Sequence, residues 1–416
     1  MTPIQHTNRN GILGVCFICI LSFTVSGQQI GFDFPDEVEK VEIPFERYNN
    51  LIVIPITINN SLTLKFILDT GVQFAILTEE AFAEFLDLKY DRRLVIQGPG
   101  MMDSVRAQVA TKVQMNLPGG ISSGVNQSLL VLEEDYLNLR KNLGADVYGI
   151  IGYDIFSRFV VEFDYDKNII VLHEPRKFRP KKYHNRVPMD IVNTKPYIST
   201  RLTFDNGEQE ELNLMVDTGA SHAILLDDGS ANVFLPAKTI KTVIGRGLGG
   251  DINGLLGRVE KLEISKYVFE NPIASFPEQS DYPSAMKRGS RNGTIGGEIL
   301  TRFHPVFDYF RGVLYLRKNR EYTTSFEHDM SGIEIMASGS KYDLVKVMAV
   351  REDSPADLAG IEVDDIITSI NGVDTSEVAF SSIITTLRFK SGKKINMKVR
   401  RRGEIIKTSF KLKRMI

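Results

Sequence analysis

The chain has 416 residues, a length that predicts two or three domains. Its hydrophobic fraction of 43% and charged fraction of 25% exclude a disordered or fibrous protein. A net charge of −2 gives no overall attraction to nucleic acid, and the two cysteines, Cys16 and Cys19, form no zinc-binding or thiol-catalysis framework.

The first 27 residues have the layout of a secretory signal peptide. Arg9 is the only charged side chain before residue 32, and an apolar run of 14 residues follows, from Ile12 to Val25. This run is shorter than the roughly 20 residues that a membrane-spanning helix needs, and small residues suit cleavage near Gly27. We therefore expect an exported protein, periplasmic or secreted, with no transmembrane anchor after cleavage. The mature chain would contain no cysteine and would depend on its core rather than on disulfides.

Two segments of the chain recur in the same order. Residues 64–77 (LKFILDTGVQFAIL) and 212–225 (LNLMVDTGASHAIL) share seven of 14 positions, and residues 149–172 and 293–316 share ten of 24. The copies lie 148 and 144 residues apart, a period too long for a solenoid. We expect two similar lobes that face each other, joined by a linker in the basic, proline-rich stretch 175–188.

Within each copy, apolar residues alternate with polar ones up to an Asp-Thr-Gly motif, as in residues 62–68 before Asp69 and 212–216 before Asp217. This period of two indicates a strand that runs into a tight loop. Short helices are expected at 82–88 and 298–303, and another from Pro355 to Gly360. The predicted fold class is mostly β with minor helix.

The paired Asp-Thr-Gly motifs carry the candidate chemistry. One copy alone predicts a capped turn. Two copies, related by a quasi-twofold axis, would bring Asp69 and Asp217 together between the lobes. Carboxylates about 3 Å apart share one proton, so that one acts as general base on a water while the other, protonated, hydrogen-bonds the substrate carbonyl. No metal, cofactor, histidine or cysteine nucleophile is required.

The neighbours of the two aspartates have predicted supporting roles. Thr70 and Thr218 are expected to hydrogen-bond across the interface, while Gly71 and Gly219 let backbone approach the carboxylates. His222 follows the second motif, either as a neighbour that tunes the pair or as a packed side chain.

With these motifs, the sequence resembles a pepsin/retropepsin-like aspartic protease built as two lobes in one chain, over about residues 45–175 and 190–318. The resemblance implies a peptide or protein substrate in the cleft between the lobes. It also implies that apolar-apolar-Gly strands pack beneath the two loops, at Ile151, Gly152, Ile295 and Gly296. Glycine-rich hairpins would form two substrate flaps, with ordinary hairpin turns as the alternative, at Gly98, Gly100, Gly247, Gly249 and Gly250.

The first motif departs from the family pattern. Ala220 and Ser221 follow the second motif as in the family, but Val72 and Gln73 follow the first. Gln73 cannot supply the hydroxyl that Ser221 does, so a catalytically silent peptide- or protein-binding relative is the alternative to an active endopeptidase. The intact pair of aspartates favours the enzyme, because a binding cleft has no need of two carboxylates that repel each other.

The C-terminal region resembles the bacterial type of PDZ domain. The segments 354–361 (SPADLAGI), 363–367 (VDDII) and 370–373 (INGV) match its signature, with Asp364 in place of the usual glycine. The resemblance implies that a peptide adds to a sheet edge and that its C-terminus is held near Gly332, Ile333 and Ile335. The alternatives are a domain that only packs on the protease, and a scaffold in which this groove alone functions.

The last 29 residues hold twelve Lys and Arg against one acid, Glu404. A solvated β-hairpin around residues 401–403 explains this charge, and attraction to an acidic membrane surface or an acidic substrate is the alternative. Too few aromatic residues are interleaved for nucleic-acid binding.

The predicted organisation therefore has a signal peptide at 1–27, a first protease lobe at 28–187, a second at 188–322 and a PDZ-like β-sandwich/α domain at 323–416. The predicted function is an exported aspartic endopeptidase with a peptide-binding module.

Overall fold

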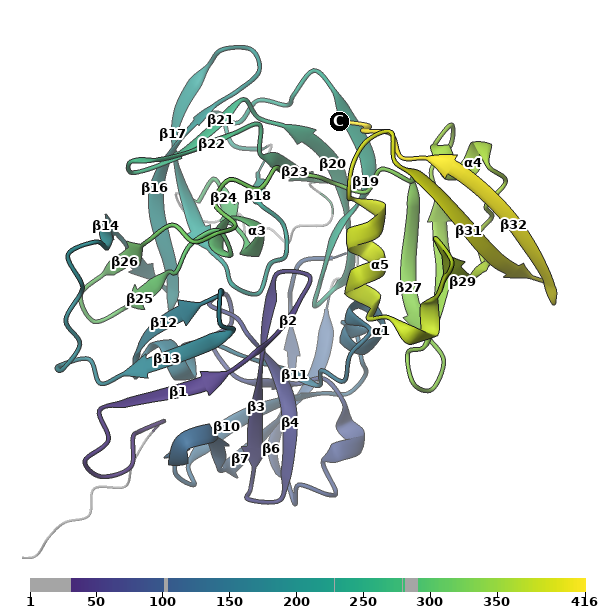
Figure 1. Cartoon of the computed structure of the whole chain (residues 1–416). Helices are drawn as coiled ribbons and strands as arrows, with labels where there is room; N and C mark the ends of the chain where they lie inside the picture. Colours follow the sequence, from purple (N-terminus) through teal and green to yellow (C-terminus); the bar gives the residue numbers. More distant parts are fainter. Residues whose placement is uncertain (1–30, 101–103, 228, 279, 281–290) are drawn as a thin grey trace, which may run out of the picture.

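The computed structural model describes residues 31–100, 104–227, 229–278, 280 and 291–416. The predicted signal peptide, with Cys16 and Cys19, lies outside the described residues. Strands dominate the chain, as predicted, and they form two lobes, a sheet that joins the lobes, and a C-terminal domain (Figure 1). No helix in the described part is long and apolar enough to cross a membrane.

The two lobes are built on the same plan. Each has a ten-stranded sheet, in the order β6-β7-β10-β5-β11-β4-β3-β8-β9 in the first lobe and β19-β20-β23-β18-β24-β17-β16-β21-β22 in the second. β2 pairs with β3, and β15 pairs with β16 at the equivalent place. The first sheet contains β2 (Glu46–Tyr48), β3 (Leu51–Ile58), β4 (Leu62–Leu68), β5 (Ile76–Leu77), β6 (Lys89–Ile96), β7 (Val105–Val113), β8 (Met115–Leu117), β9 (Ile121–Ser122), β10 (Gln127–Leu132) and β11 (Gly149–Ile151). The second contains β15 (Asp190–Val192), β16 (Lys195–Thr203), β17 (Gln209–Val216), β18 (Ile224–Leu226), β19 (Thr239–Gly247), β20 (Gly250–Arg258), β21 (Lys261–Ile264), β22 (Tyr267–Glu270), β23 (Ile273–Pro277) and β24 (Gly293–Ile295).

A six-stranded sheet joins the lobes. In its centre β12 of the first lobe pairs with β25 of the second, with Val161 opposite Phe307. The lobes also share one continuous apolar core. The strands run in the order β1 (Lys40–Pro44), β13 (Ile169–His173), β12 (Val160–Asp164), β25 (Val306–Asp308), β26 (Val313–Leu316) and β14 (Asn185–Pro188). The predicted linker therefore ends in a strand, because its residues 185–188 pair with β26.

Helices are few and short. α2 (Tyr153–Phe156) and α3 (Gly297–Leu300) follow β11 and β24 at equivalent places, and α1 (Leu139–Leu143) belongs to the first lobe alone. The helix expected at 82–88 is wrong: a 3-10 turn at Glu80–Phe82 leads into irregular turns there. Leu86 is buried in the core, but Phe85 is 73% exposed and the φ of Asp87 is 47°, which is incompatible with a continuous α-helix.

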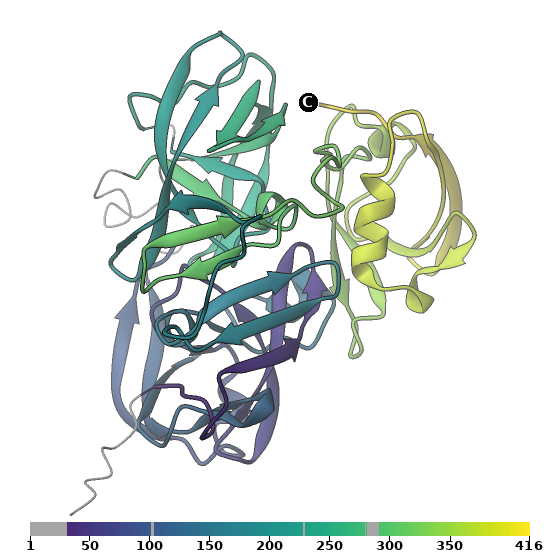
Figure 2. The ribbon, with the colours of Figure 1, turned by 60° about the vertical axis from the view of Figure 1, so that its left-hand side comes forward.

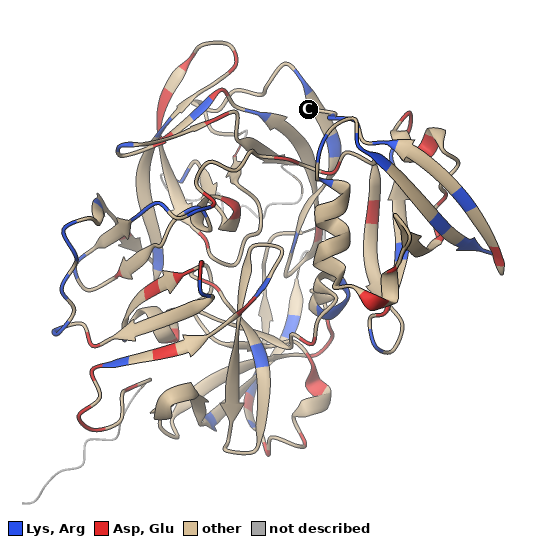
Figure 3. Ribbon diagram, in the orientation of Figure 1, with Lys and Arg blue, Asp and Glu red and all other residues tan. Residues whose placement is uncertain are grey.

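The C-terminal domain has its own core and lies to one side of the lobes (Figure 2). Its sheet follows the order β27 (Ile333–Ser338), β28 (Leu344–Val350), β29 (Ile366–Ile370), β31 (Lys394–Arg401) and β32 (Glu404–Lys411), and β30 (Val373–Asp374) pairs with β29. Ser354 caps α4 (Pro355–Leu358) by accepting from the Asp357 amide, and α5 (Phe380–Leu387) packs on the sheet. The basic C-terminal segment forms the β31–β32 hairpin, along which lysines and arginines recur (Figure 3). Lys394, Lys398 and Arg400 of β31 are exposed, whereas Arg401 is half-buried and pairs with Asp365.

Candidate active site

The two Asp-Thr-Gly loops lie at the ends of β4 and β17, between the lobes. The Asp69 amide donates to the Ile151 carbonyl and the Asp217 amide donates to the Ile295 carbonyl, each at 2.8 Å. β11 and β24 run parallel to the strands that carry the aspartates, and so fix where each loop begins.

Glycines let the two loops come together. A Cβ on Gly219 would lie 2.1 Å from Cγ of Asp69, so the first-lobe carboxylate rests against the second-lobe loop. Beneath the loops, a Cβ on Gly152 would lie 1.8 Å from the Asp69 carbonyl oxygen, and one on Gly296 would lie 2.2 Å from that of His222. These glycines are thus required by close packing and not only by turn geometry.

The threonines cross-link the loops. The Thr70 amide donates to Oγ1 of Thr218, and the Thr218 amide donates to Oγ1 of Thr70, both at 3.1 Å. Each hydroxyl then donates into the other lobe, from Thr70 to the Val216 carbonyl at 2.6 Å and from Thr218 to the Leu68 carbonyl at 2.8 Å. Because both threonines are 1% exposed, these four hydrogen bonds are shielded from water.

The loop amides hold both carboxylates. Gly71 donates to Oδ1 of Asp69 at 2.6 Å, and Gly219 donates to Oδ1 of Asp217 at 2.9 Å. Burial, with the charge of Asp217 second, raises the pKa of Asp69 well above its usual range. The structure therefore places an adjacent carboxylate pair that favours keeping one shared proton.

The departures in the first motif leave the loop backbone unchanged. The Val72 carbonyl accepts from the Tyr153 amide at 3.1 Å, just as the Ala220 carbonyl accepts from the Gly297 amide at 2.6 Å. Gln73 is exposed. Ser221 joins the site through its backbone carbonyl, which accepts from the Asn50 side chain of the first lobe at 3.1 Å.

His222 lies beside the second loop and lines the same cavity as the aspartates. Burial lowers its pKa to about 4, and within the described residues its Nε2 has no hydrogen-bond partner. The imidazole is therefore neutral at physiological pH.

The glycine-rich hairpins meet over the aspartates. The Gly249 amide of the β19–β20 turn donates to the Pro99 carbonyl of the β6–β7 connection at 2.8 Å. Gly98 and Gly100 lie on the first hairpin, and Gly247 and Gly250 flank the tip of the second. A Cβ on Gly100 would lie 2.3 Å from the Gly249 carbonyl carbon, so only glycines allow this contact.

A cavity of about 730 Å³ lies beneath these tips. Both aspartates line it, together with Gly98, Pro99, Gly247 and Leu248 of the hairpins. The cavity continues to the C-terminal domain, where Ile335, Phe380, Ile384 and Arg388 contribute to its wall. Its volume lies within the usual range of ligand-binding cavities.

Of the three residues predicted to hold a peptide C-terminus, only Ile335 lines this cavity. Ile333 is buried in the core of the C-terminal domain, and Gly332 packs on Ser354, where a Cβ would lie 2.1 Å away. The chain's own side chains take their amides: Gly332 donates to Asp329 at 2.6 Å and Ile333 donates to Ser331 at 3.3 Å.

The first lobe covers the edge strand of the C-terminal domain. α1 packs beside β27, which pairs on its other side with β28 (Figure 1). Gly144, which ends α1, fits against Phe380 of α5 so closely that a Cβ would lie 2.5 Å from the phenylalanine Cβ. Glu334 of β27 also accepts from the Thr242 hydroxyl of the second hairpin at 2.7 Å. The domain thus contacts the first lobe and one of the two hairpins.

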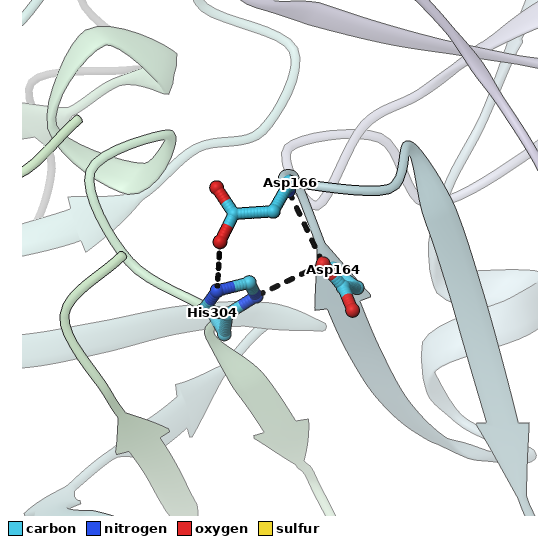
Figure 4. Close-up of side chains that lie close together, drawn as sticks. All are labelled: Asp164, Asp166 and His304. Carbon is cyan, nitrogen blue, oxygen red and sulfur yellow. Dashed lines mark hydrogen bonds and ion pairs between the residues drawn. The ribbon is translucent and has the colours of Figure 1, made fainter. Parts of the chain in front are cut away.

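A group of metal-ligand residue types lies away from the carboxylate pair, where Asp164 and Asp166 of the first lobe meet His304 of the second (Figure 4). Nδ1 of His304 lies 3.4 Å from Asp164 and Nε2 lies 3.1 Å from Asp166, so the ring has a carboxylate on each side. Asp164 also accepts from the amides of residues 166 and 167, and Asp166 pairs with Arg320 at 3.1 Å. The carboxylates are already engaged, and the contact joins the lobes.

Comparison with protein families bears on both parts of the chain. Residues 201–299 match a family model described as aspartyl protease, and residues 346–401 match one described as PDZ domain. The chain therefore contains an aspartyl-protease-like domain and a C-terminal PDZ domain, the architecture that the sequence predicted. The family match lies in the second lobe, and the first lobe repeats its strand order.

A probable CtpA-like serine protease of Staphylococcus saprophyticus subsp. saprophyticus is 28% identical over 114 residues. The match covers 26% of this chain and 21% of that protein's length. The aspartyl-protease-like domain indicates a protease, and both domains imply that peptides or proteins bind.

Sequence reasoning missed two groups near the pair. Lys195 and Arg291 line the second-lobe wall of the cavity. When the repeats are aligned at the 144-residue offset, Lys195 corresponds to Leu51 and Arg291 to Val147. The change from an apolar to a basic residue at both positions could have identified them from the sequence.

Proposed function

We propose that this protein is an exported aspartic endopeptidase that hydrolyses peptide bonds through Asp69 and Asp217. The observation that carries the proposal is the adjacent carboxylate pair, cross-linked by Thr70 and Thr218, on the floor of a cavity that two glycine-rich hairpins cover. Buried pairs of this kind retain one proton, and a single proton is what general acid–base hydrolysis by two carboxylates needs.

The chemistry requires no group beyond the pair and a water. The ionised carboxylate takes a proton from the water while its oxygen attacks the carbonyl carbon, and the protonated carboxyl hydrogen-bonds the carbonyl oxygen. The tetrahedral intermediate then loses its C–N bond, and the leaving nitrogen takes a proton from the pair. One proton remains on the pair at the end, so the site is restored.

The backbone of the first loop supports an active enzyme over a silent binding relative. Val72 occupies the position of Ala220 without loss of the carbonyl hydrogen bond to the following helix. The amide that holds Asp69 is likewise the counterpart of the one that holds Asp217.

Cleavage of a mixed peptide library tests the enzyme, with a statine-type transition-state mimic as inhibitor. An active pair should bind the mimic far more tightly than a substrate. Folded protein that neither cuts the library nor binds the mimic would favour the silent relative.

Export is proposed from the N-terminal pattern of Arg9 and the apolar run 12–25. N-terminal sequencing of protein from the periplasm or medium should give a mature end close to Gln28. Full-length protein that stays in the cytoplasm would contradict the proposal.

We also propose that the PDZ domain binds a peptide C-terminus, provided that the edge of β27 is first exposed. The edge of β27 is covered by α1, and the amides of Gly332 and Ile333 are taken. A peptide must therefore displace the first lobe from this edge before it can add to the sheet, and its carboxylate must compete with Asp329 and Ser331 for the two amides.

A further inference from the structure

The duplicated lobes supply two walls of the cavity at equivalent positions. Val53 is opposite Ile67 in the first lobe, and Tyr197 is opposite Met215 at the same place in the second. By this register, Leu51 at the start of β3 corresponds to Lys195 at the start of β16. β11 and β24 pair equivalently with the two aspartate strands, so Ile150 corresponds to Thr294 and Val147 to Arg291.

The first-lobe wall is apolar. One buried cluster contains Leu51, Ile67, Val147 and Ile150, together with leucines of α1 and of the segment before it. Leu51, Ile67 and Ile150 line the cavity. A substrate side chain on this side of the carboxylate pair meets hydrocarbon.

The second-lobe wall is basic. Lys195 and Arg291 both line the cavity, and Arg291 donates to Oγ1 of Thr294 at 2.7 Å. Among the residues that the structure describes, neither cation forms an ion pair with a carboxylate. Lys195 is half-buried and interacts electrostatically with both Asp69 and Asp217, which places its charge beside the reacting centre.

With one shared proton the Asp69–Asp217 pair carries a single negative charge, so among the described residues the two cations leave an excess of positive charge in the cavity, which a ligand carboxylate would balance. Because the pair lies on the quasi-twofold axis, the residues on either side of a cleaved bond face equivalent walls, one apolar and one basic. We infer that Lys195 and Arg291 form a subsite for a substrate carboxylate, and that the cleaved bond joins an apolar residue to one that carries this carboxylate. The inference rests on the proposed peptidase function and names its substrate class.

The carboxylate has two possible sources, an Asp or Glu side chain or the free C-terminus of the peptide. Four peptides of one sequence distinguish them. They carry Glu or Gln at the position facing the basic wall, each with a free or an amidated C-terminus. Discrimination between Glu and Gln assigns the side chain, whereas sensitivity to amidation assigns the terminus.

The enzyme tests are made on four variants. Lys195→Leu introduces the first-lobe residue, Lys195→Arg keeps the charge, and Arg291→Gln removes the second cation. Lys238→Leu removes an exposed charge that does not line the cavity and serves as the control.

We expect wild type to prefer the carboxylate-bearing peptide by roughly tenfold or more in kcat/KM, with most of the effect in KM. Lys195→Leu and Arg291→Gln should each lose most of this preference, while Lys195→Arg and Lys238→Leu keep it. Equal cleavage of all four peptides by wild type, or an unchanged preference in Lys195→Leu and Arg291→Gln, would overturn the subsite.

A binding measurement separates this inference from the proposed function. Calorimetry with the Asp69→Asn protein, alone and combined with Lys195→Leu, reads the subsite without any cleavage. If wild type cuts none of the peptides but Asp69→Asn prefers the carboxylate and the double variant does not, the subsite stands and the peptidase fails. If binding shows no such preference, the subsite fails whatever the cleavage assay gives.

Discussion

At the level of single residues, each loop of the candidate site is held by the threonine of the other lobe. The Thr218 hydroxyl accepts from the Thr70 amide and donates to the Leu68 carbonyl, and all three groups are buried. Removing this hydroxyl leaves two backbone groups of the first lobe without partners in a dry interface.

Thr218→Val should therefore lower the free energy of unfolding by about 2–4 kcal/mol and reduce kcat, because the loops lose their alignment. Urea denaturation and peptide-cleavage kinetics measure the two effects. Thr218→Ser keeps the hydroxyl and should restore most of both. A valine variant as stable and active as wild type would show that the cross-link is dispensable.

The raised pKa of Asp69 predicts the sign of the pH dependence. A carboxyl whose folded pKa exceeds its unfolded value stabilises the protein below the unfolded pKa, and this contribution is lost as pH rises through the folded pKa. Cleavage should fall over the same rise, because the shared proton is lost.

The Asp69→Asn variant lacks this titrating carboxyl group. It should cleave no peptide, because the carboxylate pair is lost. Its Tm relative to wild type should increase from acid to neutral pH. Asp91→Asn, at an exposed carboxylate on β6, is the control for the same substitution away from the cavity. If the Tm difference between Asp69→Asn and wild type does not change with pH, burial does not disfavour the ionised form of Asp69 in the folded protein.

Among the elements, the two hairpins depend on glycine where they touch. A Cβ on Gly247 would lie 2.3 Å from the Pro99 carbonyl oxygen, whereas one on Gly245 of the same strand would meet nothing within 4 Å. Neither residue has a positive φ, so alanine tests the contact without backbone strain.

Gly247→Ala should separate the tips and raise KM by roughly tenfold, with little change in Tm, because closure of the hairpins over substrate is weakened. Gly245→Ala should behave as wild type in the same kinetic assay. Equal KM values for the two variants would show that tip contact plays no part in substrate binding.

Local pattern predicted the strands well and other elements less well. The alternation at 62–68 and 212–216 predicted β4 and β17, and the repeat predicted that their ends meet. The segment 82–88 is rich in helix-forming residues, but the structure buries too little of it to stabilise a helix. Residues 185–188 looked like linker because their strand β14 is specified only by its partner β26.

For the molecule as a whole, the PDZ domain is positioned by contacts that the sequence pattern does not predict. The contacts of α1 with β27 and of Thr242 with Glu334 each join segments 92 or more residues apart. The repeats predicted two lobes but carried no information on where a third domain would dock. The basic wall of the cavity, Lys195 and Arg291, could likewise be recognised only after the strand register showed which residues of the two lobes correspond.

The fit of Gly144 against Phe380 allows this docking to be tested. Gly144→Ala should release the PDZ domain, because its Cβ would lie 2.5 Å from that of Phe380. Gly207→Ala places alanine at a similarly positive φ with nothing within 4 Å, and so controls for backbone strain.

Small-angle scattering and limited proteolysis within 318–330 report the result. Gly144→Ala should show a larger radius of gyration and faster cutting than both wild type and Gly207→Ala. It should also bind C-terminal peptides more readily at β27. Identical scattering and cutting for the two variants would mean that α1 does not hold the domain.

We propose above that Asp69 and Asp217 act as one hydrolytic pair. The most direct measurement is cleavage of a mixed peptide library from acid to neutral pH by the chain beginning near Gln28, beside folded Asp69→Ala and Asp217→Ala variants. We expect wild type to cleave peptides and either substitution to abolish this cleavage. Cleavage that survives in either variant, or none by folded wild type at any pH, would contradict it.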